Sequence, residues 1–587
     1  MNALPLWAGR AGLALAATLF LLPFLNPRHA LPLPSFHAEW LALVGGCLVI
    51  ACIPFTASGS LRIPLIASAP LLLAAVVGIQ QANGLSPYPE LTLATTGYLL
   101  WCAALVFAGA NLGKRFTLRQ AAIALASAAL AGSLANTLFA AIQLYGIGGG
   151  HGAAAGLLVS PLAPGSERIY GNLAQANHFS SYLLIGVNAA LYLVNAGKLT
   201  PSLAWAGIIA IALASSLSGS RGQILYWALT LLVWKDFFLG SLRQNIRTAI
   251  SVAIPALLAG SLFLIFGHQS PPQEIGHPLS RLLAWGDLSG HRLYLARHAV
   301  RMFLDAPFLG VGFHQFAQHM FEQALVIPET GTRWIDLHSH NLILQLLAVT
   351  GILGLFAVAL PLTRWALDFH RLPHSDEKKW ALATLGILGL HSLVEYPLWY
   401  AYFLGIAALL LGMFSTTGLT VTANWKAKLL PAAAGSGGLL ALSLCAADYH
   451  AIESRIYAPE PTTSLVGISN SPAKDALLKI YQRKFFSRYI ELTHPEWVVN
   501  DKAPLAEKLA LSSRILRFAP NEGVAYRHAI LLAANGDTQA SLGALRLALA
   551  AYPQGREAFK EKIEVLSRHN SVQLKPLLDL VESGSYP

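Results

Sequence analysis

The sequence is poor in charged residues and in cysteine. Only 12% of its 587 residues are Asp, Glu, Lys or Arg, against about a quarter in soluble proteins. The few cysteines lie inside apolar runs; none belongs to a CxxC pair, and none has a histidine at a metal-ligand spacing. They are Cys47, Cys52, Cys102 and Cys445. We interpret them as packing residues.

The motifs of nucleotide chemistry are also missing. The chain has no Asp-x-Asp metal–nucleotide motif, no P-loop, no Rossmann glycine fingerprint and no Gly-x-Ser-x-Gly elbow. An enzyme that uses a nucleotide sugar with a divalent metal is therefore unsupported, and we expect neither a metal site nor a cofactor. The net charge of +11 does not require nucleic acid as a partner, because cationic loops that orient a membrane protein account for it.

Apolar residues, in contrast, make up 55% of the chain and gather in long runs. Runs of 18 or more such residues can cross a ~30 Å hydrocarbon core, and backbone groups in lipid must bond within their own segment. We therefore predict an all-α, polytopic membrane protein with about 13 spans, the first kept as an uncleaved anchor. The spans run approximately over 9–26, 37–56, 63–81, 91–112, 120–145, 176–196, 202–219, 223–239, 248–267, 341–363, 380–396, 399–416 and 428–447.

The distribution of Lys and Arg over the loops predicts the orientation. One set of alternating loops holds roughly fifteen basic residues, whereas the short loops of the other set hold roughly three, Arg28, Arg168 and Arg221. The N-terminus is therefore expected in the cytoplasm. An odd number of spans places the C-terminal region in the periplasm, with the protein in the bacterial inner membrane.

The same topology puts a large loop and the C-terminal tail outside. The loop, residues 268–340, is too long for a simple connector. We expect a surface helix from Leu288 to Asp305, with Leu293, Ala296, Val300 and Phe303 on its apolar face.

The tail, residues 448–587, is charged and lacks long apolar runs, so we separate it as a second domain from a membrane domain of residues 1–447. Phe518-Ala519-Pro520-Asn521 is followed about 33 residues later by Ala551-Tyr552-Pro553-Gln554, and two helical patterns between them join at Asn535-Gly536-Asp537. Units of this length are typical of tetratricopeptide-like (TPR-like) repeats.

Arg221 lies between two apolar runs, in Ser220-Arg221-Gly222, on the side that otherwise avoids basic residues. A charge beside a span costs a few kcal/mol and is rarely accidental. One interpretation is an arginine that extends to the headgroups. The other is a ligand for a lipid pyrophosphate, which a planar guanidinium binds through two parallel hydrogen bonds.

His338 and His340 stand with Asn341 at the entrance of a span, shortly after Asp336. Histidine is the usual general base, and neighbouring groups fix its tautomer. One alternative to catalysis is that these histidines only make structural hydrogen bonds. Zinc is another, although the spacing matches no closed zinc motif and no cysteine lies nearby.

Further polar residues fall on the same predicted face. Arg292 follows His291 on the loop, with Arg281 upstream, and such a run is also typical of a solvated or lipid-facing belt. Glu395, at the outer end of a span, is expected either to orient a donor sugar or to pair with Arg221 or Arg292. Gln175 and Asn177 open another span and either bind sugar or cap the helix.

The order of these motifs resembles the O-antigen ligase and O-antigen polymerase superfamily. Three stretches are similar to one branch, the bacterial protein O-oligosaccharyltransferases, or pilin glycosylation ligases of the Neisseria type. They are His-Ser-His-Asn-Leu-Ile-Leu-Gln-Leu at 338–346, His-Ser-Leu-Val-Glu-Tyr-Pro-Leu-Trp-Tyr at 391–400 and Gly-Asn-Leu-Ala-Gln-Ala-Asn at 171–177.

The resemblance implies a metal-independent transfer of a glycan from undecaprenyl pyrophosphate to Ser or Thr of a periplasmic acceptor such as pilin. His340 takes the place of the catalytic histidine, and His338 that of an extra histidine of the protein-glycosylating branch. Arg221 and Arg292 take the places of arginines that hold the pyrophosphate. A tryptophan common in relatives is absent near Ala296, so Arg281 and Arg297 stay alternatives to Arg292.

Other activities use the same motifs. An O-antigen ligase would pass the glycan to the lipid A core, and a polymerase would extend another lipid-linked glycan. A lipid-linked glycan transporter predicts charges near mid-membrane and repeated halves, whereas the notable charges here gather at one face. A scaffold that works only through its tail leaves the Arg and His residues unexplained.

Overall fold

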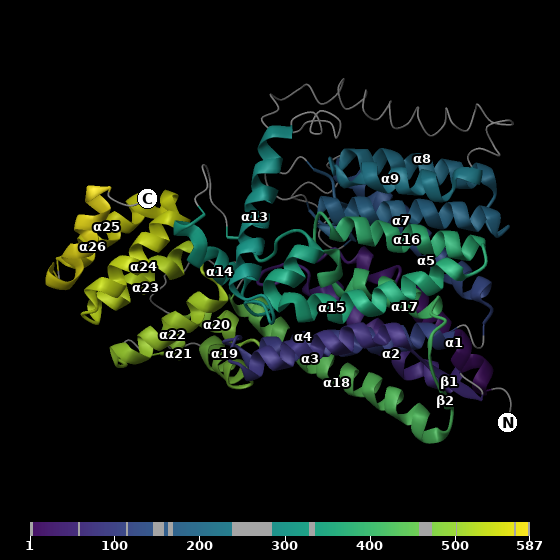
Figure 1. The fold of residues 1–587 in the computed structure, drawn as a ribbon, viewed down its shortest axis with the longest axis horizontal. Coiled ribbons are helices and arrows are strands. Elements are labelled where there is room, and N and C mark those ends of the chain that lie inside the picture. Colours follow the sequence, from purple (N-terminus) through teal and green to yellow (C-terminus); the bar gives the residue numbers. More distant parts are fainter. Residues whose placement is uncertain are drawn as a thin grey trace. The chain divides into compact units, whose positions relative to one another are not determined.

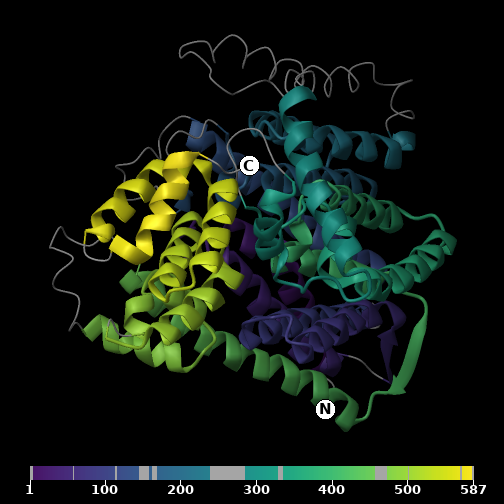
Figure 2. The ribbon, with the colours of Figure 1, turned by 60° about the vertical axis from the view of Figure 1, so that its left-hand side comes forward.

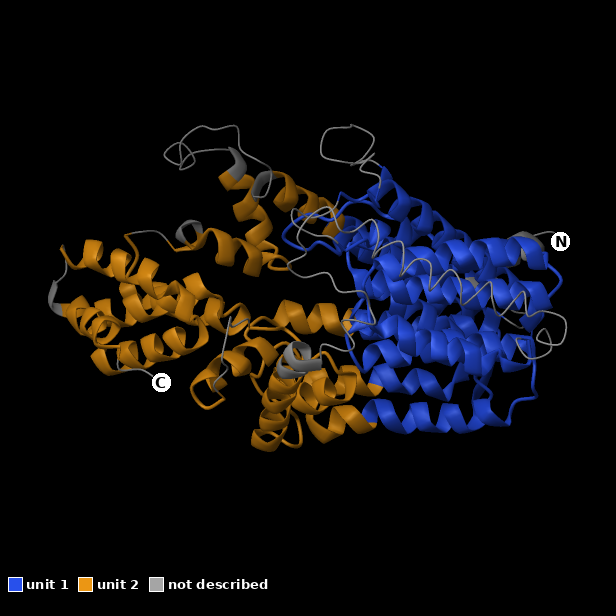
Figure 3. Cartoon of the chain, turned by 90° about the horizontal axis from the view of Figure 1, so that it is seen from above, with its two compact units in different colours: residues 1–71, 98–287, 357–444 blue, residues 72–97, 288–356, 445–587 orange. Residues whose placement is uncertain are grey.

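The computed structural model describes residues 4–56, 59–112, 116–144, 158–161, 168–237, 285–327, 335–456, 472–499, 502–568 and 571–584. Nearly all regular structure in these ranges is helical (Figure 1), so the predicted all-α class is confirmed. The chain forms two compact units (Figure 3). Unit 1 comprises residues 1–71, 98–287 and 357–444, and unit 2 comprises 72–97, 288–356 and 445–587.

The helices of the first half overlap the predicted spans, with shifts of several residues at some ends. Their bounds are α1 Leu4–Thr18, α2 Phe36–Thr56, α3 Ser68–Ala82, α4 Pro89–Leu112, α5 Leu118–Leu144, α7 Ala176–Asn195, α8 Pro201–Leu217 and α9 Gly222–Val233. Short 3-10 turns cover Leu22–Leu25, Leu65–Ala67 and Gly171–Leu173. The expected span at 248–267 lies outside the described residues.

The second half contains the loop helices, the remaining apolar helices and the tail. The loop and apolar helices are α13 Trp285–Asp305, α14 Phe316–Glu322, α15 Leu342–Arg371, α16 Asp376–Ser392, α17 Ala401–Met413 and α18 Trp425–Ile456, with 3-10 turns at Gln323–Leu325 and Pro397–Trp399. The tail helices are α19 Pro472–Gln482, α20 Ser487–Thr493, α21 Pro495–Val498, α22 Leu505–Phe518, α23 Glu522–Ala534, α24 Thr538–Ala551, α25 Arg556–Ser567 and α26 Ser571–Ser583, with a turn at Pro553–Gly555. Strands β1 Ser60–Pro64 and β2 Gly418–Thr422 pair antiparallel, with Arg62 opposite Thr420.

Five helical segments among the described residues are long and apolar enough to cross a bilayer. They are Leu65–Ala82, Pro89–Leu112, Leu118–Leu144, Leu342–Arg371 and Trp425–Ser454. The last is hardly covered by the rest of the protein, and Leu429, Leu430, Leu440 and Leu444 on it are exposed. An exposed leucine surface on an apolar helix suits lipid rather than water. The chain is a multi-pass membrane protein.

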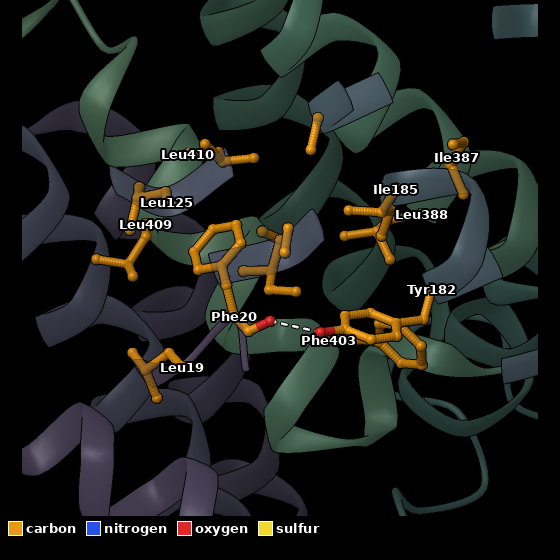
Figure 4. Close-up of a cluster of buried hydrophobic side chains, with 14 of the residues drawn as sticks. Leu19, Phe20, Leu125, Tyr182, Ile185, Ile387, Leu388, Phe403, Leu409 and Leu410 are labelled. Atoms are coloured by element: carbon orange, nitrogen blue, oxygen red, sulfur yellow. Dashed lines mark hydrogen bonds between the residues drawn. The ribbon is translucent and has the colours of Figure 1, made fainter. Parts of the chain in front are cut away.

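Unit 1 is built around α7, which packs against α5, α8, α9 and α16. Nearly every residue of α7 is buried. Tyr182 donates its hydroxyl to the Phe20 carbonyl at 2.6 Å and stacks on Phe24, within the apolar cluster of Figure 4. A buried tyrosine satisfied in this way fixes the approach of the N-terminal segment to α7.

Small residues allow α4 and α17 to approach closely within unit 1. A Cβ added to Gly109 would come within 2.3 Å of the Leu409 carbonyl oxygen, and one added to Gly412 within 2.1 Å of the Val106 carbonyl oxygen. Membrane helices associate through such backbone contacts because lipid removes most of the hydrophobic driving force.

In unit 2, the tail helices stack side by side, as the yellow helices of Figure 2 show. The two helices that the sequence predicts around Asn535-Gly536-Asp537 are α23 and α24. Phe321 and Ala324 of the large loop join the apolar core that these helices form. The loop and the tail thus share one core.

A second link ties the tail to the segment between α3 and α4. The carboxylate of Glu491, almost fully buried, accepts hydrogen bonds from Tyr88, Tyr481 and Arg514, at 2.5, 3.1 and 2.5 Å. Compact unit 2 accordingly joins residues 72–97 and 288–356 to the tail, and the division at residue 447, inside α18, stays a prediction.

Helix α13 forms where the sequence predicts the loop helix, but its buried face differs from the expected one. Tyr294, Leu295, His298, Ala299 and Met302 are buried, whereas Leu293 and Val300 are 53% and 45% exposed. Ala296 and Phe303 of the expected apolar face are half-buried, so the spacing identified an apolar face but could not select which side of the helix meets a partner.

Candidate functional site

His340 occupies a strained position directly before α15. Its φ of 54° lies in the left-handed region, which residues with a Cβ rarely adopt. The surrounding backbone fixes this conformation: Ser339 donates its amide to Gln345 Oε1 at 2.7 Å and its hydroxyl to the Asn341 carbonyl at 3.0 Å. Asn341 Oδ1 caps α15 by accepting from the amides of Ile343 and Leu344, both at 3.1 Å.

A carboxylate stands between two imidazoles in the same unit. Asp336 Oδ2 lies 3.0 Å from His291 Nε2 on α13, and Asp336 Oδ1 lies 3.9 Å from His340 Nε2. The three side chains are 26%, 38% and 22% exposed, so each is partly shielded from water. The arrangement can hold one imidazole tautomer and stabilise an imidazolium.

Two neighbouring histidines, His338 and His314, have pKa values that their surroundings lower. Burial, together with the nearby His340 and His314 and against the opposing charge of Asp336, lowers the pKa of His338 to about 3. Burial, with a contribution from Arg488, lowers the pKa of His314 to about 4; the ring of His314 bonds Thr95 Oγ1 at 2.6 Å. His338 is therefore neutral at physiological pH and a poor proton acceptor.

In unit 1, the Ser220-Arg221-Gly222 break separates α8 from α9. Gly219 takes a φ of 62°, and Ser218 Oγ accepts from the Ser220 amide at 3.2 Å while donating to the Ser215 carbonyl at 2.6 Å. These bonds hold the turn, and Arg221 becomes the residue directly before α9. A helix N-terminus and an adjacent guanidinium both favour an anion.

Arg168 is a polar residue of this region that the sequence analysis did not assign to the site. It donates from Nε to the Ser218 carbonyl at 2.9 Å and from Nη2 to Asn177 Oδ1 at 3.3 Å. Asn177 in turn donates to Glu395 Oε1 at 2.8 Å, and Glu395 is only 8% exposed. The available signal was that Arg168 is one of the few basic residues on the sparsely charged side.

The Gly-Asn-Leu-Ala-Gln-Ala-Asn motif serves as a structural turn as well. Gln175 Oε1 caps α7 by accepting from the His178 amide at 2.6 Å, so the capping interpretation describes this side chain. Gln175, His178, Tyr400 and Tyr402 line a cavity of about 220 Å³ in unit 1. Spacing did not single out the two tyrosines, although both lie in or beside the 391–400 stretch.

The predicted site residues divide between the units. Arg221, Gln175, Asn177 and Glu395 belong to unit 1, and Arg292, His338, His340 and Asn341 to unit 2. Arg292 is exposed on α13, whereas Arg281 lies outside the described residues. Within the described ranges, no three His, Cys, Asp or Glu side chains gather as a set that could hold a metal ion.

Three family models match successive parts of the chain. Residues 169–194 match the model described as protein glycosylation ligase, and residues 206–359 the model described as O-antigen ligase. Residues 379–564 match the C-terminal part of the virulence factor membrane-bound polymerases. The second match contains Arg221, Arg292 and His340, and the third extends into the tail.

Individual relatives agree with these matches. A general O-oligosaccharyltransferase from Acinetobacter baylyi is 26% identical over 412 residues, which cover 68% of this chain and 69% of that protein. Putative polysaccharide ligases from Rickettsia conorii and Rickettsia felis are 24% and 22% identical over 155 residues, 26% of this chain and 37% of each ligase. The resemblance predicted from the motifs is confirmed: this chain is similar both to O-antigen ligases and to a protein O-oligosaccharyltransferase.

Proposed function

We propose that the protein transfers a preassembled glycan from undecaprenyl pyrophosphate to Ser or Thr hydroxyls of periplasmic proteins such as pilin. The observation that carries the proposal is His340, held in a left-handed conformation beside a carboxylate, in a segment that matches the O-antigen ligases. Strained residues of this kind concentrate at functional sites. The match to protein glycosylation ligases at 169–194 favours a protein acceptor.

In this mechanism, His340 takes the proton of the acceptor hydroxyl as its oxygen attacks the anomeric carbon. The bond from that carbon to the pyrophosphate oxygen breaks in the same displacement, which inverts the anomeric configuration. Arg221 and Arg292 stabilise the negative charge on the leaving pyrophosphate through two-pronged hydrogen bonds. Because the leaving group is already ionised and paired with guanidinium groups, the displacement needs no divalent metal.

The remaining residues orient the substrates in this proposal. Glu395 and Asn177, which are bonded to one another, contact the donor sugar, and Gln175 supports the helix terminus beside them. His338 and Asn341 shape the acceptor side of His340. The site faces the periplasm, on about 13 spans, with the N-terminus in the cytoplasm. The tail forms a TPR-like periplasmic surface that guides the acceptor protein toward His340.

An O-antigen ligase or polymerase is the second candidate function. It is favoured by the match of residues 379–564 to membrane-bound polymerases and by the ligase match at 206–359. The chemistry at the anomeric carbon would be the same, and only the acceptor hydroxyl would differ.

The proposal is tested by expressing the protein with a lipid-linked glycan pathway and a candidate pilin in cells that lack their own ligase. We expect a glycan-sized increase in the mass of the pilin, and no increase with His340→Ala at equal membrane level. Glycan on lipid A core or longer lipid-linked chains, with unmodified pilin, would establish the second candidate instead.

A further inference from the structure

We infer that Asp336 and His291 are positioning residues for His340, with Asp336 holding the imidazole of the base and His291 holding Asp336. The inference rests on the proposed function, because it assigns roles around the same base. It gives His291 a role, and it turns the proximity of Asp336 in the sequence into a specific contact.

The geometry places one oxygen of Asp336 toward each ring. Both contacts are ion-pair contacts, the Oδ2–His291 contact at 3.0 Å and the Oδ1–His340 contact at 3.9 Å, and Oδ2 is buried without a well-aligned hydrogen bond among the described residues. Bonds at a catalytic base are often long without substrate and tighten when it binds. A proton on Nε2 of His340 points toward Asp336 in this arrangement, so Nδ1 becomes the basic nitrogen.

Two structural elements converge to make this arrangement. His291 comes from α13, and Asp336 and His340 come from the irregular segment 335–341 directly before α15. Buried residues of α13, α14 and α15 share one apolar cluster, which includes Leu295, Met320 and Val349. The distance between the carboxylate and His291 is therefore fixed by packing rather than by a flexible loop alone.

The charges around His340 explain why it needs such a partner. When His340 accepts a proton it becomes a cation beside His338, which also lies near His314, and Arg488 of the tail adds positive charge at His314. Asp336 is the negative group that faces the new imidazolium among these described side chains. A carboxylate at this distance stabilises the protonated base and keeps the ring in the productive orientation.

The test uses Asp336→Asn and Asp336→Glu in purified full-length protein, with turnover measured against pH and donor concentration. The matched control is Glu322→Gln, because Glu322 pairs with His319 at 3.0 Å on α14, a similar carboxylate–imidazole contact away from His340. We expect Asp336→Asn to lower kcat about 10- to 100-fold, less than the roughly 10²- to 10⁴-fold contribution of a general base itself, with the donor KM unchanged. The acid limb of its pH–rate profile should move to lower pH, because the lost carboxylate no longer favours the charged imidazole.

Two further outcomes separate positioning from a structural role. Asp336→Glu should restore part of kcat, and Glu322→Gln should behave as wild type. His291→Gln should lower kcat less than Asp336→Asn, and the double variant should be no worse than Asp336→Asn, because both act through one contact.

Wild-type kcat and pH profile in Asp336→Asn would overturn the inference, and so would equal losses in the Asn and Glu variants with an unmoved acid limb. In either case the proposed function stands if wild type transfers glycan and His340→Ala does not. Absence of transfer by the wild-type protein would instead count against the proposed function.

Discussion

The left-handed backbone of His340 predicts opposite stability effects for two substitutions that both remove the imidazole. A residue with a Cβ costs about 1–2 kcal/mol at such a φ, and glycine avoids this cost but loses about 0.5–1 kcal/mol through its freedom in the unfolded chain. The difference leaves His340→Gly more stable than His340→Ala by about 0.5–1 kcal/mol. Since both variants lose the same side-chain contacts, the comparison isolates the backbone term.

Leu337 offers a matched control in the same segment. It is 66% exposed, and it is not among the described non-glycine residues with positive φ. Leu337→Gly should therefore be less stable than Leu337→Ala, the reverse of the order at His340. Thermal unfolding in detergent, followed by tryptophan fluorescence, measures both pairs under one condition.

The same variants test the chemistry. His340→Gly leaves a space where the ring was, so free imidazole should restore part of its glycan transfer and less of that of His340→Ala. Equal stability of the two variants at His340, or the same order as at Leu337, would refute the argument from backbone strain. Full transfer by either variant without imidazole would refute the role of His340 as the base.

Four further outcomes follow from the described contacts. Arg221→Lys should keep less than about a tenth of wild-type kcat/KM for the donor, because lysine lacks the planar fork; near-normal kinetics would contradict a bidentate pyrophosphate contact. The pKa of His338 is lowered to about 3 and that of His314 to about 4, so below about pH 6.5 the unfolded chain binds protons that the folded protein does not. The free energy of unfolding should therefore fall on acidification by at most about 2 kcal/mol per histidine at pH 5, and His338→Gln should reduce this fall. Glu491→Ala should destabilise the protein by about 2–3 kcal/mol, below the range for fully buried pairs because Arg514 is 39% exposed; unchanged thermal unfolding would show that this contact does not secure the tail. Alkaline phosphatase fused after the last residue should be active, and an inactive fusion would place the tail in the cytoplasm.

The structure also changes how the role of the tail is best tested. Phe321 and Ala324 of the loop are buried in the same core as the tail helices. Removing residues after about 450 would therefore expose this core and remove the packing of the loop that leads to His340. A truncation therefore confounds acceptor guidance with loss of folding. Substitutions at exposed tail positions, compared with transfer to a short soluble peptide, separate the two roles.

Hydropathy was sufficient for the membrane helices, because a span requires a long apolar run whatever it packs against. Apart from 248–267, each expected span overlaps a helix of the described structure, and five of the described helical segments are long and apolar enough to cross a bilayer, so the number of spans stays a prediction. Local capping was also predictable, since Gln175 and Asn341 bond amides two or three residues away.

Contacts between distant residues were not predictable in this way. Asn177 and Glu395 are 218 positions apart, and His291 and Asp336 meet only because α13 packs on the segment before α15. Periodicity carries no information on such pairings. The side of α13 that is buried could not be predicted for the same reason, because the packing partner determines which side of the helix is covered.

The central claim is that this protein moves a glycan from a lipid pyrophosphate to a protein hydroxyl with His340 as the base. The most direct measurement incubates purified protein with a defined undecaprenyl-pyrophosphate glycan and a Ser/Thr-containing acceptor in excess EDTA, and follows the acceptor by mass spectrometry. The account predicts a glycan-sized mass increase and release of undecaprenyl pyrophosphate with wild type, and neither with His340→Ala. An unmodified acceptor, or transfer that stops in EDTA and returns with a divalent ion, would contradict it.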